Sequence, residues 1–427
     1  MGLVLFSSLF IFLFSGIPIA IALSTAALLG VLLTDTTVPL IVVSQRMFTS
    51  IDSFPFMAAP FFILAGNLME KGGISKRLIK FCQSILGFLS SSLGIITIVA
   101  SAFFGAISGS NVATVAAIGG IMIPAMVKAG YPKNLSAAIS ASSGTLGVVI
   151  PPSIPMVTYG ITASVSIGRL FLAGFIPGLL LAGVISVCVL FLARGCEEKE
   201  EVHSFEFKDL LLSFKDAIWA ILMPIIILGG IYGGVFTPTE AAAVAAVYAL
   251  IVSVFIYKEI EMKDLKPVFI NSAVTSSVIL FIVSCSAPFA WLMTNASVPE
   301  AVSSAILAMF DNKYIILLLL NFILLTLGMF METQSIILLM TPILIPLALS
   351  LGIDLTALGI IIVVNTSIGM ITPPLAVNLF VASSISKSTI EQVSKSVMPF
   401  LIAEVAIVLL ITFYPGIITW LPDLLGK

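Results

Sequence analysis

Two segments of this 427-residue chain repeat one another 222 residues apart, and the repeat preserves helix-breaking residues. A gapless overlay of residues 121–152 on residues 343–374 gives 8 identities in 32 positions. Five of the eight are Gly or Pro, namely Pro124, Gly130, Gly147, Pro151 and Pro152, which match Pro346, Gly352, Gly369, Pro373 and Pro374. Broken helices at membrane depth occur where they surround a cavity, and many secondary transporters build binding sites from them. The repeat therefore predicts a duplicated unit with one broken helix in each copy.

The composition places this duplicated unit in a membrane. Hydrophobic residues make up 59% of the chain, charged residues 9%, and the mean hydropathy is +1.22. Since about 20 apolar residues span a bilayer, the long apolar stretches predict roughly ten or eleven crossings in an all-α polytopic protein. The first stretch, residues 4–33, lacks a basic n-region, so we expect a retained membrane helix and no signal peptide. The net charge of −2, without a clustered basic face, predicts no nucleic-acid partner.

Basic residues give a topology when they are placed in the cytoplasm. Five basic loops satisfy this rule: Lys71 to Lys80, Lys128 with Lys133, Arg194 to Lys215, Lys258 to Lys266, and Lys387 with Lys395. Counting crossings between them gives two re-entrant hairpins, 88–127 opening inside and 314–349 opening outside. Each is followed by a discontinuous helix, 134–165 or 355–385. The two copies therefore enter from opposite faces as inverted repeats, and the C-terminus is expected outside. Segments 36–48 and 258–267 are candidate interfacial arm helices.

Small and polar residues at the hairpin tips and helix breaks are the candidate binding groups. Unwound backbone frees carbonyl oxygens, and neighbouring hydroxyl and amide oxygens complete a cage of the kind that holds Na⁺ in transporters with broken helices. Two repeats predict two Na⁺ sites, formed by Ser108, Asn111, Gly144, Thr145 and Gly147 in one copy and by Gly328, Gln334, Asn365, Gly369 and Thr372 in the other. Helix N-termini favour an anion between them, with Ser108, Ser110, Ser153, Glu332, Thr333 and Thr372 as candidate substrate contacts.

These residues also have a structural interpretation. Small polar residues are common helix contacts in any membrane bundle, although their pairing beside duplicated Pro-Pro breaks favours a site. Glu332 is either a functional carboxylate or a cap of the half-helix that follows it. Glu404 is the other well-embedded carboxylate, while Glu240 follows Thr237 in the pattern of a capping box.

Enzyme functions lack the necessary residues. No GxxxxGK[ST] motif is present, so the chain contains no nucleotide-driven motor of that type. The one histidine, His203, falls in an acidic stretch that reads as a solvated loop, which leaves no Ser-His dyad. The four cysteines form no CxxC motif and predict neither a disulfide framework nor a metal site. The remaining alternatives are a Na⁺-coupled importer and a channel or passive membrane scaffold.

Four motifs resemble one transporter family across essentially the whole chain. They are PFFILAGNLM at residues 60–69, TPTEAAA at 237–243, IPPS at 150–153 and ITPP at 371–374. Together they resemble the large membrane subunit, the DctM-like component, of tripartite ATP-independent periplasmic (TRAP) transporters. The overall likeness leans towards the sialic-acid branch. The resemblance implies Na⁺-driven import of an organic acid, such as sialic acid or a C4-dicarboxylate, across the bacterial inner membrane. It also implies two partners: a four-helix small membrane subunit and a periplasmic substrate-binding protein.

The resemblance further implies an elevator mechanism and a domain division. Residues 1–54 would form scaffold helices and an arm, residues 55–193 the first half of a transport domain, and residues 194–216 a cytoplasmic loop. Residues 217–267 would form the second scaffold part, and residues 268–427 the second transport half with the last helix. In this division the scaffold lies largely around Pro18 and Pro238.

Overall fold

The computed structural model describes residues 1–34, 37–89, 91–194, 196 and 206–426, and the regular structure in this part of the chain is helical. Eight of the described helices are long and apolar enough to cross a membrane, and up to ten spans result if two bent helix pairs are each counted as one. The all-helical membrane fold predicted from the sequence is confirmed. His203 lies outside the described residues.

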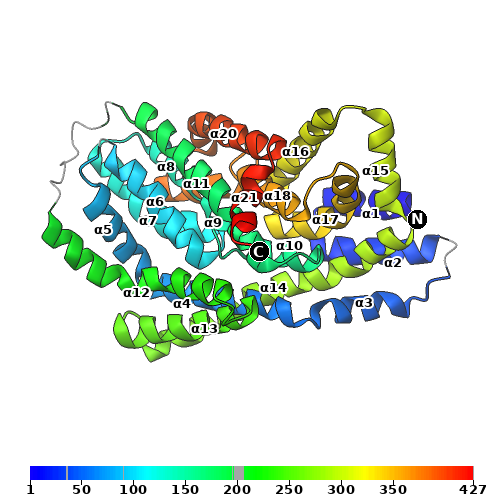
Figure 1. Ribbon diagram of the computed structural model, residues 1–427, viewed down its shortest axis with the longest axis horizontal. Coiled ribbons are helices and arrows are strands. Elements are labelled where there is room, and N and C mark those ends of the chain that lie inside the picture. The colour runs from blue at the N-terminus through cyan, green and yellow to red at the C-terminus, as the bar shows by residue number, and fades with distance from the viewer. Residues whose placement is uncertain (35–36, 90, 195, 197–205, 427) are drawn as a thin grey trace.

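The chain forms two similar series of helices (Figure 1). The first comprises α1 (Gly2–Phe14), α2 (Ile19–Leu33), α3 (Ile41–Ile51), the short helix η1 (Phe54–Met57), α4 (Ala58–Lys71), α5 (Ile74–Leu86), α6 (Ser92–Ser108), α7 (Asn111–Ala129), α8 (Lys133–Ser143), α9 (Leu146–Val149), α10 (Ile154–Thr162) and α11 (Ile167–Leu192). The second comprises α12 (Phe207–Tyr232), α13 (Pro238–Ile251) with the π-helical turn η3 (Val252–Ile256), α14 (Met262–Asn295), α15 (Val298–Met309), α16 (Lys313–Phe330), α17 (Thr333–Ser350), α18 (Leu355–Gly369), α19 (Val377–Ser386), α20 (Ile390–Phe413) and α21 (Gly416–Leu424).

Both predicted hairpins and both predicted breaks are present. The hairpins are α6–α7 and α16–α17, and the discontinuous helices are α8–α9–α10 and α18–α19. The Pro-Pro doublets lie in the two breaks, and both doublets have a cis peptide bond. The duplicated helix breakers thus mark the same feature in each copy.

Several local predictions were wrong. Residues 4–33 form two packed helices, because Gly16 takes a left-handed conformation and Pro18 is the N-cap of α2. The basic stretch after Lys71 is the helix α5, whose buried residues, among them Ile74, Leu78 and Cys82, recur at helical spacing on one face. The basic residues of this stretch therefore favoured the prediction of a loop where an amphipathic helix forms.

Three further boundaries differ in the second copy. The predicted arm 258–267 is not a separate helix, because a capping box of Glu261 and Asp264 begins the 34-residue helix α14 there. Helix α15 was not predicted and occupies the position of α5. Helix α12 begins at Phe207 inside the predicted loop 194–216. Arm 36–48 corresponds to α3.

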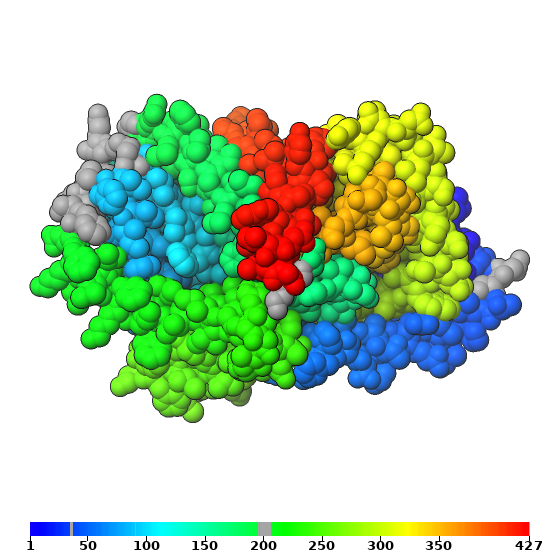
Figure 2. Space-filling view, viewed as in Figure 1, coloured from blue at the N-terminus to red at the C-terminus, as the bar shows by residue number. Residues whose placement is uncertain are grey.

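The two copies are intertwined. In Figure 1, α12, α4, α14 and α3 run across the lower part of the molecule with α13 below them, and the first hairpin lies above them on the left and the second on the right. Helices α1 and α2 share a buried apolar cluster with α14 and α17, which includes Leu5, Leu23, Phe289 and Ile343. Helix α12 packs against α5, and α13 packs against α4. Each copy's first helices therefore pack against the other copy. In Figure 2, the C-terminal residues (red) lie at the centre of this face, between the first hairpin on the left and the second on the right.

The predicted cytoplasmic loops contact one another in the structure. Arg77 forms a 3.0 Å ion pair with Glu259, and the Lys80 ammonium lies 3.8 Å from the Asp216 carboxylate. Asn134, beside Lys133, donates to Ser396 at 2.6 Å. Three of the basic segments thus lie together, and the other two lie together; their placement in the cytoplasm stays a prediction.

Candidate ion and substrate site

The first hairpin tip is a two-residue link, Gly109 and Ser110, held by hydrogen bonds of nearby hydroxyl groups. Gly109 adopts the left-handed region at φ 60°, which ends α6 at Ser108. Ser110 is the N-cap of α7, and its Oγ accepts from the Ala113 amide at 3.4 Å. The Ser110 carbonyl accepts from Thr114 Oγ1 at 2.8 Å. Asn111 is consequently fixed as the first residue of α7.

The second tip has the same course without the same cap. Helix α16 ends at Phe330, and Glu332 stands in the N-cap position of α17 with an extended backbone. Its side chain makes no capping hydrogen bond. The capping role considered for Glu332 is therefore not what its side chain does here. Thr333 and Gln334 form the first turn of α17.

The two tips converge on the break that follows α18. Asn111 Nδ2 donates to Ser367 Oγ at 2.8 Å and lies 3.4 Å from Met370 Sδ. Thr333 Oγ1 lies 3.8 Å from the same sulfur. The N-termini of α7 and α17, which carry partial positive charge, thus approach one point from the two copies.

The axis relating the two copies passes close to this point. Ser367 Oγ donates to the Thr145 carbonyl at 2.7 Å, and these residues are 222 positions apart. Equivalent residues of two symmetric copies touch only near their common axis. The axis that relates the two copies of the sequence repeat therefore passes close to the centre of the site.

Glycine pairs bring the breaks into contact with the hairpins. A Cβ on Gly105 of α6 would lie 2.8 Å from Gly147 Cα, and one on Gly328 of α16 would lie 2.9 Å from Gly369 Cα. Only glycine permits such a close backbone crossing. On its other side, Gly147 lies against the Ser110 carbonyl, where a Cβ would come to 2.5 Å from the oxygen.

Two amide oxygens at the tips lack a partner. Asn111 and Gln334 are 2% and 3% exposed, and neither Asn111 Oδ1 nor Gln334 Oε1 has a hydrogen-bond partner in the described part of the chain. An unsatisfied buried polar atom is costly and requires an explanation. An oxygen-ligated cation satisfies such acceptors, so the residues present fit Na⁺.

A cavity of about 290 Å³ opens between the tips and a wall formed by α4 and α14. The tips contribute six of the predicted residues to its lining: Ser108, Ser110, Asn111, Glu332, Thr333 and Gln334. The wall contributes Asn67, Glu70 and Thr275, among others. The structure thus brings the two predicted tip clusters together around one space.

The remaining predicted residues lie in or beside the breaks. Gly147, Gly328 and Gly369 form the close backbone crossings, and Gly144 and Thr145 precede Gly147 in the first break. Ser153 caps α10 by accepting from Met156, and Thr372 Oγ1 donates to the Ile368 carbonyl at 2.9 Å. These two hydroxyls are not part of the cavity lining. Asn365 directs its Nδ2 to Asn321 Oδ1 at 2.6 Å, away from the tips' own hydrogen bonds.

Sequence reasoning missed Asn321, Asn67 and Glu70. Asn321 also accepts from Thr412 at 3.2 Å and so joins α16, α18 and α20. A lone amide in the apolar run of α16 was a detectable signal. Asn67 and Glu70 fall at the end of α4, where the adjacent basic residues suggested a loop.

Glu404 of α20 is fully buried, and neither carboxylate oxygen has a hydrogen-bond partner among the described residues. Its side chain interacts with Thr145, at the break of the first copy. Glu404 therefore lies behind the break and not in the cavity lining.

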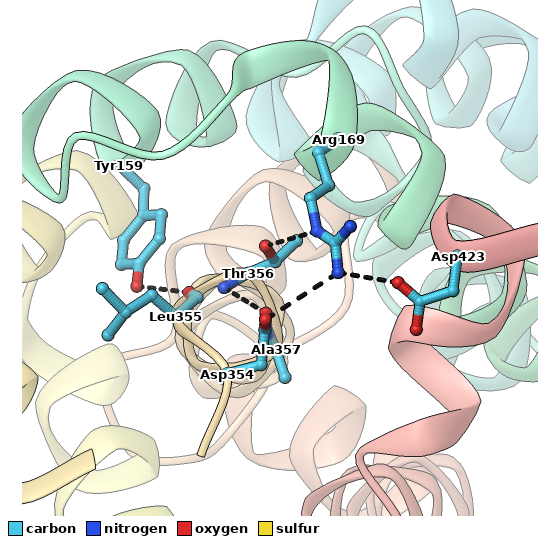
Figure 3. A network of polar contacts seen from close by, with 7 residues as sticks. All are labelled: Tyr159, Arg169, Asp354, Leu355, Thr356, Ala357 and Asp423. Carbon is cyan, nitrogen blue, oxygen red and sulfur yellow. Dashed lines mark hydrogen bonds and ion pairs between the residues drawn. The ribbon is translucent and has the colours of Figure 1, made fainter. Parts of the chain in front are cut away.

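A larger cavity, about 580 Å³, lies between the α10–α11 link and the α12–α13 turn. Its one charged lining residue, Arg169, is already engaged: Nη2 lies 2.8 Å from Asp423 Oδ1 and 3.8 Å from Asp354 Oδ2, and Nε donates to Thr356 (Figure 3). Asp354 in turn caps α18. This network joins both copies to the C-terminal helix α21 and is an anchor.

Comparisons with known proteins agree with this architecture. The family model described as "Tripartite ATP-independent periplasmic transporter, DctM component" matches residues 6–417. An isethionate TRAP transporter permease protein, DctMQ, of Oleidesulfovibrio alaskensis is 44% identical over 97% of this chain and 65% of its own length, so this chain spans just under two thirds of that relative.

Two further relatives match along nearly their whole lengths. The C4-dicarboxylate TRAP transporter large permease protein DctM of Rhodobacter capsulatus is 40% identical, covering 100% of this chain and 99% of its own. The sialic acid TRAP transporter large permease protein SiaM of Vibrio cholerae is 35% identical over 96% of each chain. Among solved structures, the YdaH transporter of Alcanivorax borkumensis shares the fold with a TM-score of 0.61, 14% identity and coverage of 86% of this chain and 87% of that one. By the family match and by these identities, the chain belongs to the tripartite ATP-independent periplasmic transporter family as its DctM component.

Proposed function

We propose that this chain is the membrane permease of a Na⁺-coupled importer of organic acids in a bacterial inner membrane. The chain is a multi-pass TRAP permease, and relatives are named for C4-dicarboxylate, sialic acid and isethionate. The observation that carries Na⁺ coupling is the pair of unpartnered oxygens, Asn111 Oδ1 and Gln334 Oε1, at the two tips. Each tip supplies one cation site.

In this proposal the breaks complete the two Na⁺ sites. Carbonyl and hydroxyl oxygens around Gly144 and Thr145 join Asn111, and those around Thr366 and Gly369 join Gln334. The cations and the two helix N-termini then neutralise one anion held between the tips. Cargo and Na⁺ bind together because each lowers the electrostatic cost of the other.

Movement is proposed to occur along the cavity wall. Helix α4 packs most extensively against α13, and α14 packs against α2, α3 and α4. We therefore assign α4 and α14 to the scaffold, whereas the division expected from the sequence put residues 58–71 and 268–295 in the transport domain. The two hairpins with their breaks form the part that slides as an elevator. A small membrane subunit and a periplasmic binding protein complete the importer, and the C-terminal helix faces the periplasm.

Reconstitution tests this function. The chain is co-purified with its small membrane subunit, placed in proteoliposomes, and supplied with its binding protein loaded with radiolabelled acid. We expect uptake only with an inward Na⁺ gradient and only with the binding protein. Uptake that persists in choline buffer, or without the binding protein, would show a passive pathway and contradict the proposal.

A further inference from the structure

The cavity at the hairpin tips has two carboxyl side chains on facing sides. Glu332 enters from the second tip, and Glu70 enters from α4. Glu332 is exposed and Glu70 is half-buried. Neither forms an ion pair within the described ranges, and the cavity lining includes no Lys, Arg or His. For the permease of an organic anion, this is an unexpected charge distribution.

Independent observations mark this space as a ligand site. Asn111 and Gln334 also line it, and their side-chain oxygens are buried without a described partner. Both belong to the first turns of long helices, α7 and α17, whose amide groups favour an anion. The cavity therefore has a buried part that attracts negative charge, at the first turns of α7 and α17, and a more exposed part that accepts hydrogen bonds, at the side chains of Glu70 and Glu332.

The two regions place opposite demands on a cargo. An anionic group fits at the helix N-termini. A second anionic group in the more exposed part would approach Glu70 and Glu332, and no basic side chain lines the cavity to offset the repulsion. A donor such as a hydroxyl or an ammonium group, by contrast, satisfies the carboxylate oxygens.

We propose that the cargo is a small acid with one anionic group at one end and a hydrogen-bond donor at the other, and that Glu70 and Glu332 select it over dicarboxylates. This inference rests on the proposed function and narrows its substrate class. The cavity volume of about 290 Å³ sets the scale of the cargo, at the lower end of small-molecule sites. Glu70 acts from the scaffold wall and Glu332 from the moving tip, so recognition requires both surfaces.

A three-carbon series tests the proposal without changing cargo length. Malonate carries a second carboxylate, 3-hydroxypropionate a hydroxyl, β-alanine an ammonium group and propionate a methyl group at the same position. Binding of each is measured by isothermal titration calorimetry to the purified complex of this chain with its small membrane subunit, in NaCl. The binding protein is left out, so its own selectivity does not enter.

We expect the preferred donor-bearing acid to bind at least about tenfold more tightly than malonate and propionate, because an unpaired or repelled group at a polar site costs that much or more. The comparison between 3-hydroxypropionate and β-alanine then identifies the donor. Glu70→Gln and Glu332→Gln should each reduce the preference over malonate, while Glu391→Gln, an exposed glutamate paired with Lys395 on α20, should leave it unchanged.

The results distinguish this inference from the function beneath it. Malonate binding as tightly as 3-hydroxypropionate and β-alanine would overturn the donor proposal and leave organic-acid import intact. A preference that survives both glutamine substitutions would remove Glu70 and Glu332 as its source and overturn the proposal too. If none of the four acids binds in NaCl, the small-acid proposal is overturned too, and the proteoliposome uptake assay with the binding protein present decides the proposed function separately.

Discussion

The two hairpin tips occupy equivalent places and are built differently. Tip 1 (108–111) is capped by Ser110 and tied to the other copy through Asn111 and Ser367. Tip 2 (331–334) has no side-chain cap, and Glu332 is left exposed to the cavity. The difference indicates that the first tip organises the centre of the molecule, whereas the second tip keeps its polar groups for a ligand.

The largest effect is expected where the copies are alike. Gly147→Ala and Gly369→Ala each place a Cβ about 2.5 Å from backbone atoms, against Ser110 or Gly328. Because backbone cannot rotate away, each should destabilise the fold by about 3 kcal/mol or more. Thermal unfolding in detergent measures the loss.

Gly120→Ala is the matched control, since nothing lies within 4 Å of its Cβ position in α7. It should keep the unfolding temperature or raise it slightly, because Ala favours a helix. An unchanged unfolding temperature in both break variants would show that the two crossings are looser than described.

Substitutions of Asn111 and Gln334 should reduce the unfolding free energy by different amounts. Asn111→Ala removes the donor to buried Ser367 and should cost about 1–3 kcal/mol of unfolding free energy. Gln334→Ala removes an oxygen that has no described partner and should cost less. Chemical unfolding in Na⁺-free buffer compares them, and equal losses would deny the first tip its special structural role.

Substitutions at the two N-cap positions should also destabilise the first tip more than the second, by a smaller amount. Ser110→Ala loses an N-cap hydrogen bond and should cost about 1 kcal/mol. Glu332→Ala loses no cap hydrogen bond and should leave unfolding nearly unchanged. A larger loss for Glu332→Ala, measured by thermal unfolding, would restore the capping interpretation of that residue.

The smallest effect is expected at the anchor that joins the copies. Asp423→Asn weakens the partly exposed ion pair with Arg169, which should cost at most about 1 kcal/mol and become undetectable in high salt. Asp354 remains to hold the guanidinium. A loss that persists in 1 M NaCl, about ten times the salt at which surface pairs are already screened, would require a different role for α21.

Much of this difference between the tips was legible in the sequence. The 222-residue spacing of Gly and Pro identified the breaks, because Gly and Pro suit the irregular backbone there, while the hairpin orientations inferred from loop charges stay a prediction. Ser110, Asn111, Glu332 and Gln334 followed as tip residues. The sequence could not show that Ser153 and Thr372 spend their hydroxyls on nearby backbone, since hydrogen-bond direction depends on rotamers.

Contacts between residues far apart in the sequence could not be predicted either. The wall residues Asn67 and Glu70 come to the cavity only because α4 packs across the copies against α13 and α14. Helix α5 was hidden by its charges, although its apolar face repeats at helical spacing. The intertwining of the copies follows from packing that no local pattern encodes.

The number of Na⁺ ions that each tip holds tests the central claim most directly. Initial uptake rates are measured against Na⁺ concentration for the reconstituted complex and for the Asn111→Ala and Gln334→Ala variants. If each tip holds one Na⁺, the Hill coefficient for Na⁺ activation of uptake should be about 2 in the native complex and fall to about 1 in either variant. Native Na⁺ activation in both variants, with the same Hill coefficient, would contradict the assignment of these two oxygens to the cation sites.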